Sequence, residues 1–204
     1  MKRRFVHIPF GKGDKRVVVT LCRKPMQKGL AGYIRGKSLP GNLALILSDL
    51  PPTRLGFEFA ALADYGSGAV FGVIMTSEVF HGIRRGDAMA RTCLFHELGH
   101  YQRGHTAQQN SDISTKDLER CRIASEGEVS PFELEADAFA AEYLGNACII
   151  AGLAAIRDCQ ARKLEDSAYD RDSILISIRE LERRISVLRS YTIIHNDNKT
   201  IENY

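Results

Sequence analysis

Residues 93–105, CLFHELGHYQRGH, constrain this chain more than any other stretch of it. His96 and His100 are four residues apart, so on a helix they lie one turn apart on the same face, with about 5–6 Å between their Cβ atoms. Two imidazole rings at that separation can bind one cation, and Glu97 can reach a water on that cation without being a ligand itself. This H-E-x-x-H arrangement predicts a helix with two zinc ligands and a general base. The alternative is an exposed helix whose histidines bind nothing.

The composition is typical of a soluble globular protein. Of the 204 residues, 44% are hydrophobic and 26% are charged, which suits one domain, alone or with an added helical segment. The net charge of +3 is too small to predict a nucleic-acid partner. The basic residues are scattered, and we expect the short clusters at residues 2–4 and 183–184 to be solvated surface.

The cysteines and the apolar stretches indicate a cytoplasmic protein. The five cysteines are widely spaced and form no C-x-x-C pair, which is typical of reduced thiols and not of a cysteine-ligated zinc site. No long apolar run follows the basic N-terminal residues, so no secretory signal is predicted. The most apolar stretch, residues 139–156, contains Glu142 and Asn146, which favours a pair of buried core helices over a membrane span.

The first third of the chain is typical of strands. RFVHIPF and RVVVTLC flank the Gly-rich turn GKGD and predict a hairpin. LGFEFAALADYGSG and AVFGVIMTSEVF predict two further strands, while LPGNLALILSDLPP is either a short helix or a buried strand. From about residue 85 onward the pattern is helical, with a polar loop at 107–116 and candidate helices at 86–103, 116–124, 131–144, 147–162 and 172–190. We therefore expect an α+β fold in which a small antiparallel or mixed sheet precedes a helical half and a long C-terminal helix.

The last candidate helix has an apolar pattern of its own. Its apolar residues alternate spacings of four and three, as in a coiled-coil seam: Ile174, Ile178, Leu181, Ile185 and Leu188. Only two heptads support the pattern, which is too few to predict a coiled coil. The helix either packs on its own domain or forms a homodimer through residues 172–190.

A catalytic zinc ion usually has three protein ligands, and the nearest third candidate is His105. The longer motif H-E-x-x-H-x-x-G-x-x-H requires glycine and histidine where this chain has Arg103 and Thr106. On a continuing helix His105 would also point away from the face of His96 and His100. We therefore expect His105 to be a surface or helix-end histidine.

The stretch SPFELEADAFAAEYL, residues 130–144, offers a better third ligand. Ser130 and Pro131 predict the start of a helix, with serine as N-cap and proline as its first residue. Glu133 and Asp137 are four residues apart and share a face of that helix. Glu133 could complete the metal site while Asp137 accepts a hydrogen bond from the outer nitrogen of a ligating histidine.

A capping box is the competing interpretation of Glu133. In the pattern Ser130-x-x-Glu133, the glutamate side chain would fold back onto its own helix terminus. Glu135 would then be the spare carboxylate, although it lies on another face of the helix.

Together the two motifs resemble those of the gluzincin metallopeptidases. HELGH is followed about thirty residues later by E-x-x-A-D-x-F-A-A-E, here residues 133–142, and the pair is most similar to the compact soluble ImmA/IrrE-type proteases. Aspartate stands at 137, where that group usually has asparagine, and is the form found in membrane-embedded gluzincins. The resemblance covers about residues 69–145. It implies a bound Zn2+ and these roles: His96, His100 and Glu133 as metal ligands, Glu97 as base, and Asp137 as hydrogen-bond partner of His96.

The motifs and the strand and helix pattern together predict a domain organisation that reaches beyond the residues covered by the resemblance. Residues 1–162 would form a zincin-like metallopeptidase domain, with strands within 1–80 and motif helices at 86–105 and 131–145, and residues 163–204 a C-terminal helical extension. In gluzincins the strand before the motif helix lines the cleft as a sheet edge. AVFGVIMTSEVF would then be the edge strand over the active site, to which an extended peptide could add. The alternative is an interior, buried strand.

These features predict a cytoplasmic zinc-dependent endopeptidase that cleaves a protein or peptide substrate, with Glu97 activating a zinc-bound water. The resemblance makes a transcriptional regulator one candidate for that substrate. One alternative is a zinc-binding regulatory module of the same fold with little turnover, against which the presence of Glu97 argues; another is zinc-dependent hydrolysis of a non-peptide amide. As a second oxyanion donor beside the metal, the sequence offers Tyr101, Tyr143, His81 and His195 and does not choose among them.

Overall fold

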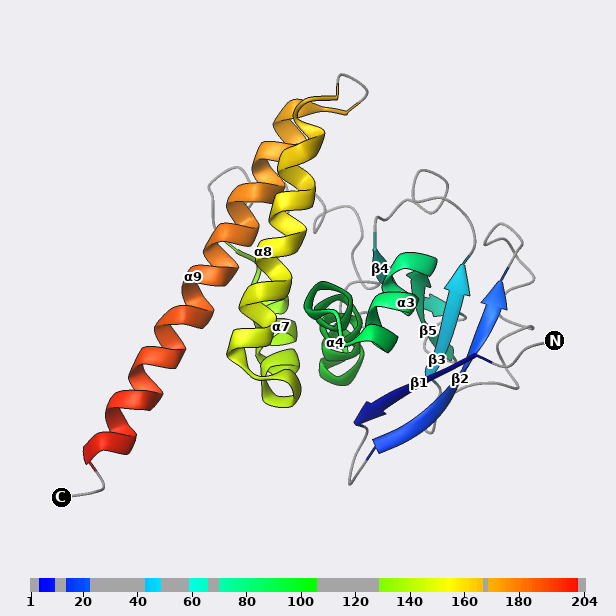
Figure 1. Cartoon of the computed structure of the whole chain (residues 1–204), viewed down its shortest axis with the longest axis horizontal. Coiled ribbons are helices and arrows are strands. Elements are labelled where there is room, and N and C mark those ends of the chain that lie inside the picture. The colour runs from blue at the N-terminus through cyan, green and yellow to red at the C-terminus, as the bar shows by residue number, and fades with distance from the viewer. Residues whose placement is uncertain are drawn as a thin grey trace.

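The structure is a computed structural model that describes residues 4–9, 14–22, 43–48, 59–65, 70–105, 129–166 and 169–201. These residues form an α+β fold in which a five-stranded mixed sheet lies on one side of the molecule and the long helices lie on the other (Figure 1). The expected fold class is confirmed. The expected loop at 107–116 and the expected helix at 116–124 lie outside the described residues.

The sheet has the strand order β1-β2-β3-β5-β4, and its strands are β1 (Arg4–Pro9), β2 (Asp14–Cys22), β3 (Leu43–Ser48), β4 (Ala60–Tyr65) and β5 (Val70–Thr76). β1 and β2 form the predicted antiparallel hairpin, β3 is parallel to both β2 and β5, and β4 is antiparallel to β5. Residues 43–48 are a strand and not a helix. All six are buried, as is typical of an apolar run with a parallel neighbour on each side.

The strand at the edge nearest the motif helix is β4, not β5. β5 pairs with β3 on one side and with β4 on the other, so the expectation that AVFGVIMTSEVF forms the sheet edge is wrong and the interior alternative is correct. The expected strand also ends early, at Thr76, where α3 (Ser77–Arg85) begins. The Thr76 hydroxyl accepts a hydrogen bond from the Val79 N–H at 3.4 Å and caps this helix.

The helical half contains α4 (Ala88–Arg103), α7 (Pro131–Leu144), α8 (Asn146–Lys163) and α9 (Arg171–Ile201). α4 begins two residues later than expected because the Asp87 side chain caps it, accepting a hydrogen bond from the Ala90 N–H at 2.8 Å. α7 has the predicted bounds, and Gly145, with a φ of 80°, separates it from α8. α9 extends eleven residues beyond the expected end at 190, to 201.

Two glycines let α4 approach its neighbours closely. α4 lies between the sheet and α7, and it contacts β4, β5, α7 and α8 (Figure 1). A Cβ added at Gly99 would lie 2.8 Å from the Cα of Ala136, so this glycine allows the backbones of α4 and α7 to meet. A Cβ added at Gly152 would overlap with the Thr92 side chain, so this glycine allows α8 to lie against α4.

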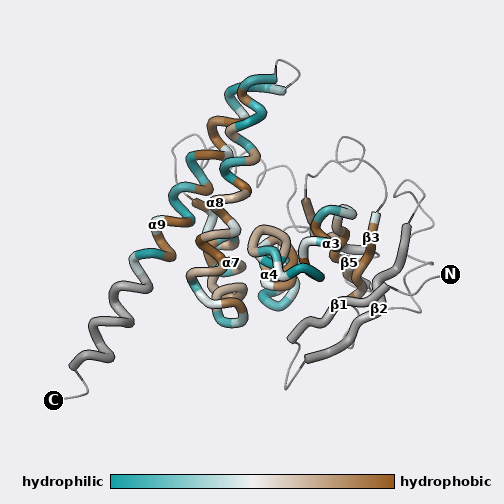
Figure 2. Tube along the Cα trace, in the orientation of Figure 1, coloured by the Kyte–Doolittle hydropathy of each residue, from teal (hydrophilic) through white to brown (hydrophobic). Residues whose placement is uncertain are grey.

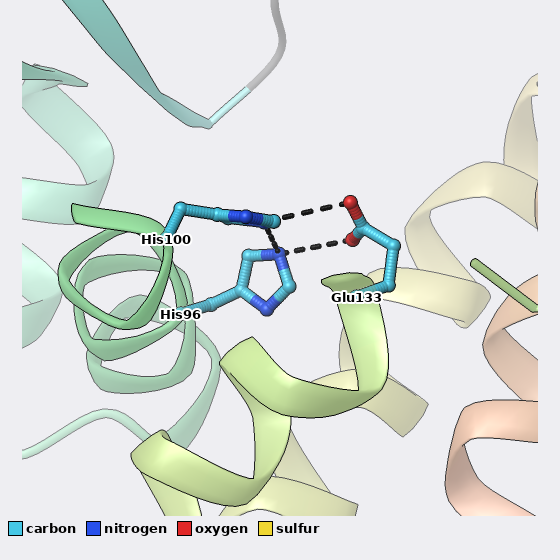
Figure 3. A group of neighbouring side chains, drawn as sticks. All are labelled: His96, His100 and Glu133. Atoms are coloured by element: carbon cyan, nitrogen blue, oxygen red, sulfur yellow. Dashed lines mark hydrogen bonds and ion pairs between the residues drawn. The ribbon is translucent and has the colours of Figure 1, made fainter. Parts of the chain in front are cut away.

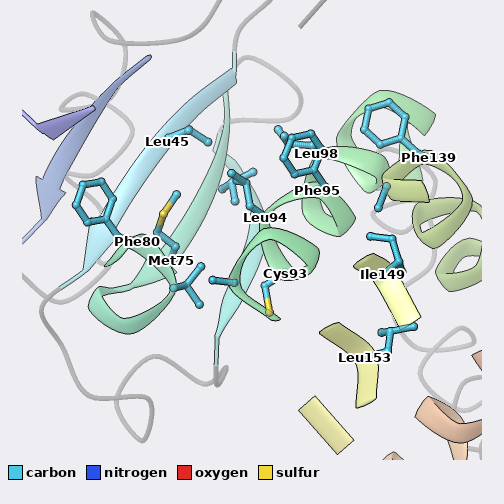
Figure 4. Packing of buried hydrophobic residues seen from close by; sticks show 14 of the residues in the cluster. Leu45, Met75, Phe80, Cys93, Leu94, Phe95, Leu98, Phe139, Ile149 and Leu153 are labelled. Carbon is cyan, nitrogen blue, oxygen red and sulfur yellow. The ribbon is translucent and has the colours of Figure 1, made fainter. Parts of the chain in front are cut away.

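One hydrophobic core joins the sheet to the helices. It runs from Leu45 and Met75 on the strands, through Leu94 on α4, to Phe139 on α7 and Leu153 on α8 (Figure 4). Figure 2 shows the hydrophobic strands beside α3 and the polar residues at the far end of the α8–α9 hairpin. Burial of this apolar surface is the main term that holds the sheet and helices together.

α9 belongs to this core. Leu181, Ile185 and Leu188, three of the five seam residues, are buried in it, and α9 packs along α8. The helix therefore packs on its own domain, and a homodimer through residues 172–190 stays a prediction. Within the described ranges, no helix combines the length and the apolar character that crossing a membrane requires.

Candidate metal centre

Three side chains from two helices meet at one point (Figure 3). His96 and His100 come from successive turns of α4, and their Nε2 atoms are 3.0 Å apart. Glu133, in the first turn of α7, places Oε2 3.0 Å from His96 Nε2 and Oε1 3.4 Å from His100 Nε2. The structure thus brings together the three residues that the sequence predicts as ligands.

This group could hold a metal ion. At metal–ligand distances of about 2.0–2.1 Å, two ligands of a tetrahedral zinc site lie about 3.3 Å apart, within a few tenths of an ångström of the separations here. The three donor atoms all lie within 4.8 Å of one another, and no other group of three such residues occurs in the described part of the chain. Both histidines are buried, which shields the site from bulk water.

The capping-box interpretation of Glu133 is not what the fold adopts. Ser130 is the N-cap of α7, but its side chain makes no capping hydrogen bond. The Glu133 carboxylate points instead at the two imidazole rings (Figure 3). The Glu133 N–H, which a capping side chain would bind, donates instead to the Ser130 carbonyl oxygen at 3.0 Å.

The outer nitrogen of His96 faces a pair of buried, charged side chains. His96 Nδ1 lies 2.8 Å from Asp137 Oδ1, one turn beyond Glu133 on α7. Arg184 of α9 donates two hydrogen bonds of 2.7 Å to the Asp137 carboxylate, from Nε and Nη2, and its Nη1 lies 3.1 Å from Glu133 Oε2. Such fork-shaped guanidinium–carboxylate pairs fix the orientation of the carboxylate.

Arg184 is the site residue that the sequence analysis missed. We expected residues 183–184 to be solvated surface, and for Arg184 this is wrong, since it is only 8% exposed. Arg183 is exposed, as expected. A signal was present: Arg184 follows Leu181 by three residues and precedes Leu188 by four, so it lies on the apolar seam of the helix.

The outer nitrogen of His100 faces a third histidine. His100 Nδ1 lies 2.8 Å from His105 Nδ1, and His105 Nε2 lies 3.2 Å from Glu135 Oε2. His105 directly follows Gly104, the C-cap of α4, so the helix-end alternative is correct, whereas the surface alternative is wrong because His105 is 1% exposed. Since Gly104, with a φ of 70°, ends α4 at this point, the projection of His105 along a continuing helix does not apply.

Glu97 lies beside the three donors and binds the sheet edge. Its Oε2 accepts a hydrogen bond of 2.8 Å from the Leu62 N–H of β4. Burial raises the pKa of Glu97 to about 7, and repulsion from Glu133 adds to this rise, while attraction to His96 and the bond from Leu62 oppose it. The edge strand thus holds the carboxylate that the motif predicts as base.

The charges around the donors favour a cation. Burial alone would raise the pKa of Glu133 and of Asp137, but attraction to His96 and to Arg184, with the hydrogen bonds, lowers both below their usual range. Burial and Arg184 lower the pKa of His96, yet the two carboxylates outweigh them and raise it to about 10. The Glu133 carboxylate, which stabilises a proton on His96 Nε2, would also stabilise a metal ion bound to that nitrogen.

A cavity of about 220 Å³ adjoins His96, one of the three donors. It is formed by the start of β4 and by α4, α8 and α9, and Glu97 and Arg184 also line it. Its other walls mix apolar side chains, such as Leu153, with polar ones, such as Glu180. The C-terminal helix, expected as an extension of the domain, therefore forms part of the wall beside the site.

None of the expected oxyanion donors with described side chains lines this cavity. His81 and Tyr143 are exposed, and Tyr101 packs edge-on against Phe71 with ring centroids 5.4 Å apart. The side chain of His195 lies outside the described residues.

Comparisons with known proteins give no match: no family model, no curated protein and no solved structure is similar to this chain. The function therefore has to be argued from the geometry of the centre itself.

Proposed function

We propose that the chain is a zinc-dependent endopeptidase that hydrolyses peptide bonds of a cytoplasmic protein. One observation carries the proposal: the donors of His96, His100 and Glu133 converge, and the Glu97 carboxylate lies beside them without being one of them. A structural zinc site is closed by four protein ligands, whereas a catalytic site has three and an open position. In the described ranges no fourth donor joins the group.

Zinc is the metal that this donor set favours. Two imidazole nitrogens and one glutamate form the ligand set of a common class of catalytic zinc site. When bound, zinc supplies a positive charge that polarises a carbonyl group and lowers the pKa of water to about 7. His96 and His100 would hold it through Nε2, and Glu133 through its carboxylate.

Glu97 would act first as general base and then as general acid. One carboxylate can take a proton from the attacking water and deliver it to the leaving amine. The hydrogen bond from Leu62 engages Oε2 and holds the side chain on the β4 side of the site. Asp137 and Arg184 would keep the His96 ring oriented while this transfer takes place.

The outer edge of β4, the last strand of the sheet in the described residues, offers a place for the substrate backbone beside the Leu62 N–H that Glu97 engages. An extended peptide that adds to this edge would pass the metal centre. One of its side chains could enter the adjoining cavity, whose walls offer both apolar and polar contacts.

The resemblance to the ImmA/IrrE-type proteases suggests which proteins to test first. A transcriptional regulator is the candidate substrate by that analogy alone. No distance or contact in the site selects it over another protein with an accessible extended segment.

Replacing Glu97 with glutamine tests the role of this carboxylate. The amide keeps the size of the side chain but cannot accept a proton, so Glu97→Gln should retain one zinc ion per chain and lose cleavage by about 100-fold or more. Zinc is measured by elemental analysis, and cleavage by new N-termini in a cell lysate. Unchanged cleavage would refute the role of Glu97. Stoichiometric zinc without any cleavage by the unaltered chain would favour the regulatory module or a non-peptide amide substrate.

Replacing Glu133 with alanine tests the third ligand. Glu142 lies on the same helix with its side chain 63% exposed, so Glu142→Ala is the matched control. We expect Glu133→Ala to lose zinc and Glu142→Ala to retain it, both measured by elemental analysis after dialysis. Equal zinc content in the two variants would exclude Glu133 as a ligand.

A further inference from the structure

His100, His105 and Glu135 form a row of three side chains that runs from the buried metal centre to the surface. His100 Nδ1 lies 2.8 Å from His105 Nδ1, and the opposite nitrogen of His105 lies 3.2 Å from Glu135 Oε2. The side chain of His105 is 2% exposed and that of Glu135 is 56% exposed, so the row runs from the metal centre to the surface. Neither His105 nor Glu135 is among the three converging donors.

The fold places His105 here through the end of α4. Gly104 has a φ of 70°, in the left-handed region that favours glycine, and its N–H bonds back to the last turn of the helix. The chain therefore leaves the helix axis at this residue, and the His105 ring lies against Phe132 of α7, with centroids 4.8 Å apart. Its contact with His100 is edge-on, at a centroid distance of 5.0 Å.

The chemistry of imidazole fixes where the protons of this row lie. If His100 offers Nε2 to a metal ion, its proton is on Nδ1, which must donate. The acceptor 2.8 Å away is His105 Nδ1, which must then carry a lone pair. The His105 proton is consequently on Nε2 and is donated to Glu135. Each nitrogen has one role, and every role is satisfied.

We propose that His105 and Glu135 are positioning residues for the metal centre: they fix the proton and the ring orientation of His100, as Asp137 does for His96. This inference rests on the proposed zinc site. The two supports differ in kind, because Asp137 is a charged acceptor held by Arg184, whereas His105 is a neutral acceptor whose own proton is held by a surface carboxylate.

Two substitutions at position 105 separate positioning from packing. His105→Leu replaces the imidazole with an apolar side chain of similar size and leaves the His100 Nδ1–H without an acceptor. His105→Asn places an amide oxygen near the position of Nδ1 and restores the acceptor while removing more volume. Loss of a hydrogen-bond partner of a metal-bound histidine commonly costs about 10- to 100-fold in metal affinity. We expect a loss in this range for His105→Leu and recovery to within about 5-fold of the unaltered chain for His105→Asn.

Zinc affinity is measured by competition with a chromophoric chelator, with zinc alone as the ligand. The second measurement is the imidazole N–H spectrum of the zinc-loaded protein labelled with 15N-histidine. The unaltered chain and His105→Asn should show a protected proton on His100 Nδ1, which exchanges rapidly in His105→Leu. Glu135→Gln, which keeps an acceptor oxygen at the surface, should change the affinity by about 3-fold or less.

The outcomes are distinguishable from those for the proposed function. If the unaltered chain binds no zinc, the proposed function falls and this inference falls with it. If it binds zinc and His105→Leu binds it equally well, the inference alone is overturned. Equal weakening by leucine and asparagine would overturn it too, because packing alone would then explain the effect. Should His105→Leu not fold, a proton on His100 Nε2 rather than Nδ1 in the unaltered chain would decide against it.

Discussion

The α4–α7 pair and the α8–α9 hairpin contribute to the same centre in different ways. α4 and α7 supply the three donor atoms, and Gly99 lets their backbones meet so that Glu133 reaches the two histidines. Among the side chains that the structure describes, the hairpin supplies no donor to the group. It contributes Arg184, which holds Asp137, and part of the cavity wall.

The residues that would bind the metal and the residues that hold those ligands in place are therefore specified by the chain in different ways. The two histidine donors are placed by their spacing along one turn of α4, and Glu133 joins them because α4 and α7 pack closely at Gly99. His96 is held by Asp137, and Asp137 in turn is held by the guanidinium of Arg184, which lies 47 residues later in the chain. If this comparison is right, changes in α9 should affect stability strongly although none of its described side chains is a ligand.

The largest expected effect comes from removing the buried cation. Arg184→Met removes the cation that pairs with the buried carboxylate of Asp137 and leaves it only the contact with His96, and breaking a buried ion pair on one side costs about 3–5 kcal/mol. Arg183→Met changes an exposed neighbour and should cost less than about 0.5 kcal/mol. Urea unfolding of both variants measures the difference. Similar free energies of unfolding for the two variants would mean that the contact of Arg184 with Asp137 does not stabilise the fold.

The sequence predicts the donors well because their spacing is local. The helical repeat places the two histidines on one face of α4 and the two carboxylates on one face of α7, which has the expected bounds. That these two faces meet is predicted by ligand chemistry and by the motif resemblance, not by local spacing. His105 and Arg184 escape that argument for different reasons. His105 follows a glycine that ends the helix, and Arg184 finds its partner only when α9 packs on the domain.

The sheet shows the same limit. The hairpin β1–β2 is a local pairing, and its two segments and turn predict it. Which of β4 and β5 lies at the edge depends on the parallel pairing of β3 with β5 across an intervening stretch of chain. The pattern of apolar residues indicates both strands but not their order, and the edge was assigned to the wrong one.

The next prediction asks whether α9 is held by its buried seam. Leu181 is 6% exposed and joins the common core, while Ile176 on the same helix is 36% exposed. Leu181→Ala should cost about 2–4 kcal/mol, through lost burial and the space left behind. Ile176→Ala should cost less than about 1 kcal/mol. Thermal unfolding of the two variants provides the comparison, and equal losses would show that the seam does not anchor the helix.

A smaller effect is expected where α4 and α7 meet. Gly99→Ala would push a methyl group against the backbone of Ala136, and overpacking of this kind costs about 1–3 kcal/mol. Because α7 must move, zinc affinity should fall as well. Gly86→Ala, at the end of α3, is the control: no atom lies within 4 Å of the added methyl, but the φ of 78° makes the residue strained. It should lose some stability and keep its zinc affinity. If Gly99→Ala lost stability but kept its zinc affinity, the close approach of α4 and α7 would not be needed to position Glu133.

The smallest effect is on the reactivity of a thiol, and it measures how firmly the hairpin closes over α4. Cys93 lines the cavity, is 7% exposed, and has its pKa raised strongly by burial, so little thiolate forms. Cys148 and Cys159 on α8 are half-buried. A thiol reagent applied to the folded protein should therefore label Cys93 last of these three, as read by mass spectrometry of peptides.

In Arg184→Met the hairpin loses its charged contact with α7, and local opening should raise the labelling rate of Cys93 while those of Cys148 and Cys159 stay within about 2-fold. An unchanged rate at Cys93 would mean that apolar burial alone closes the hairpin and that Arg184 acts only on Asp137.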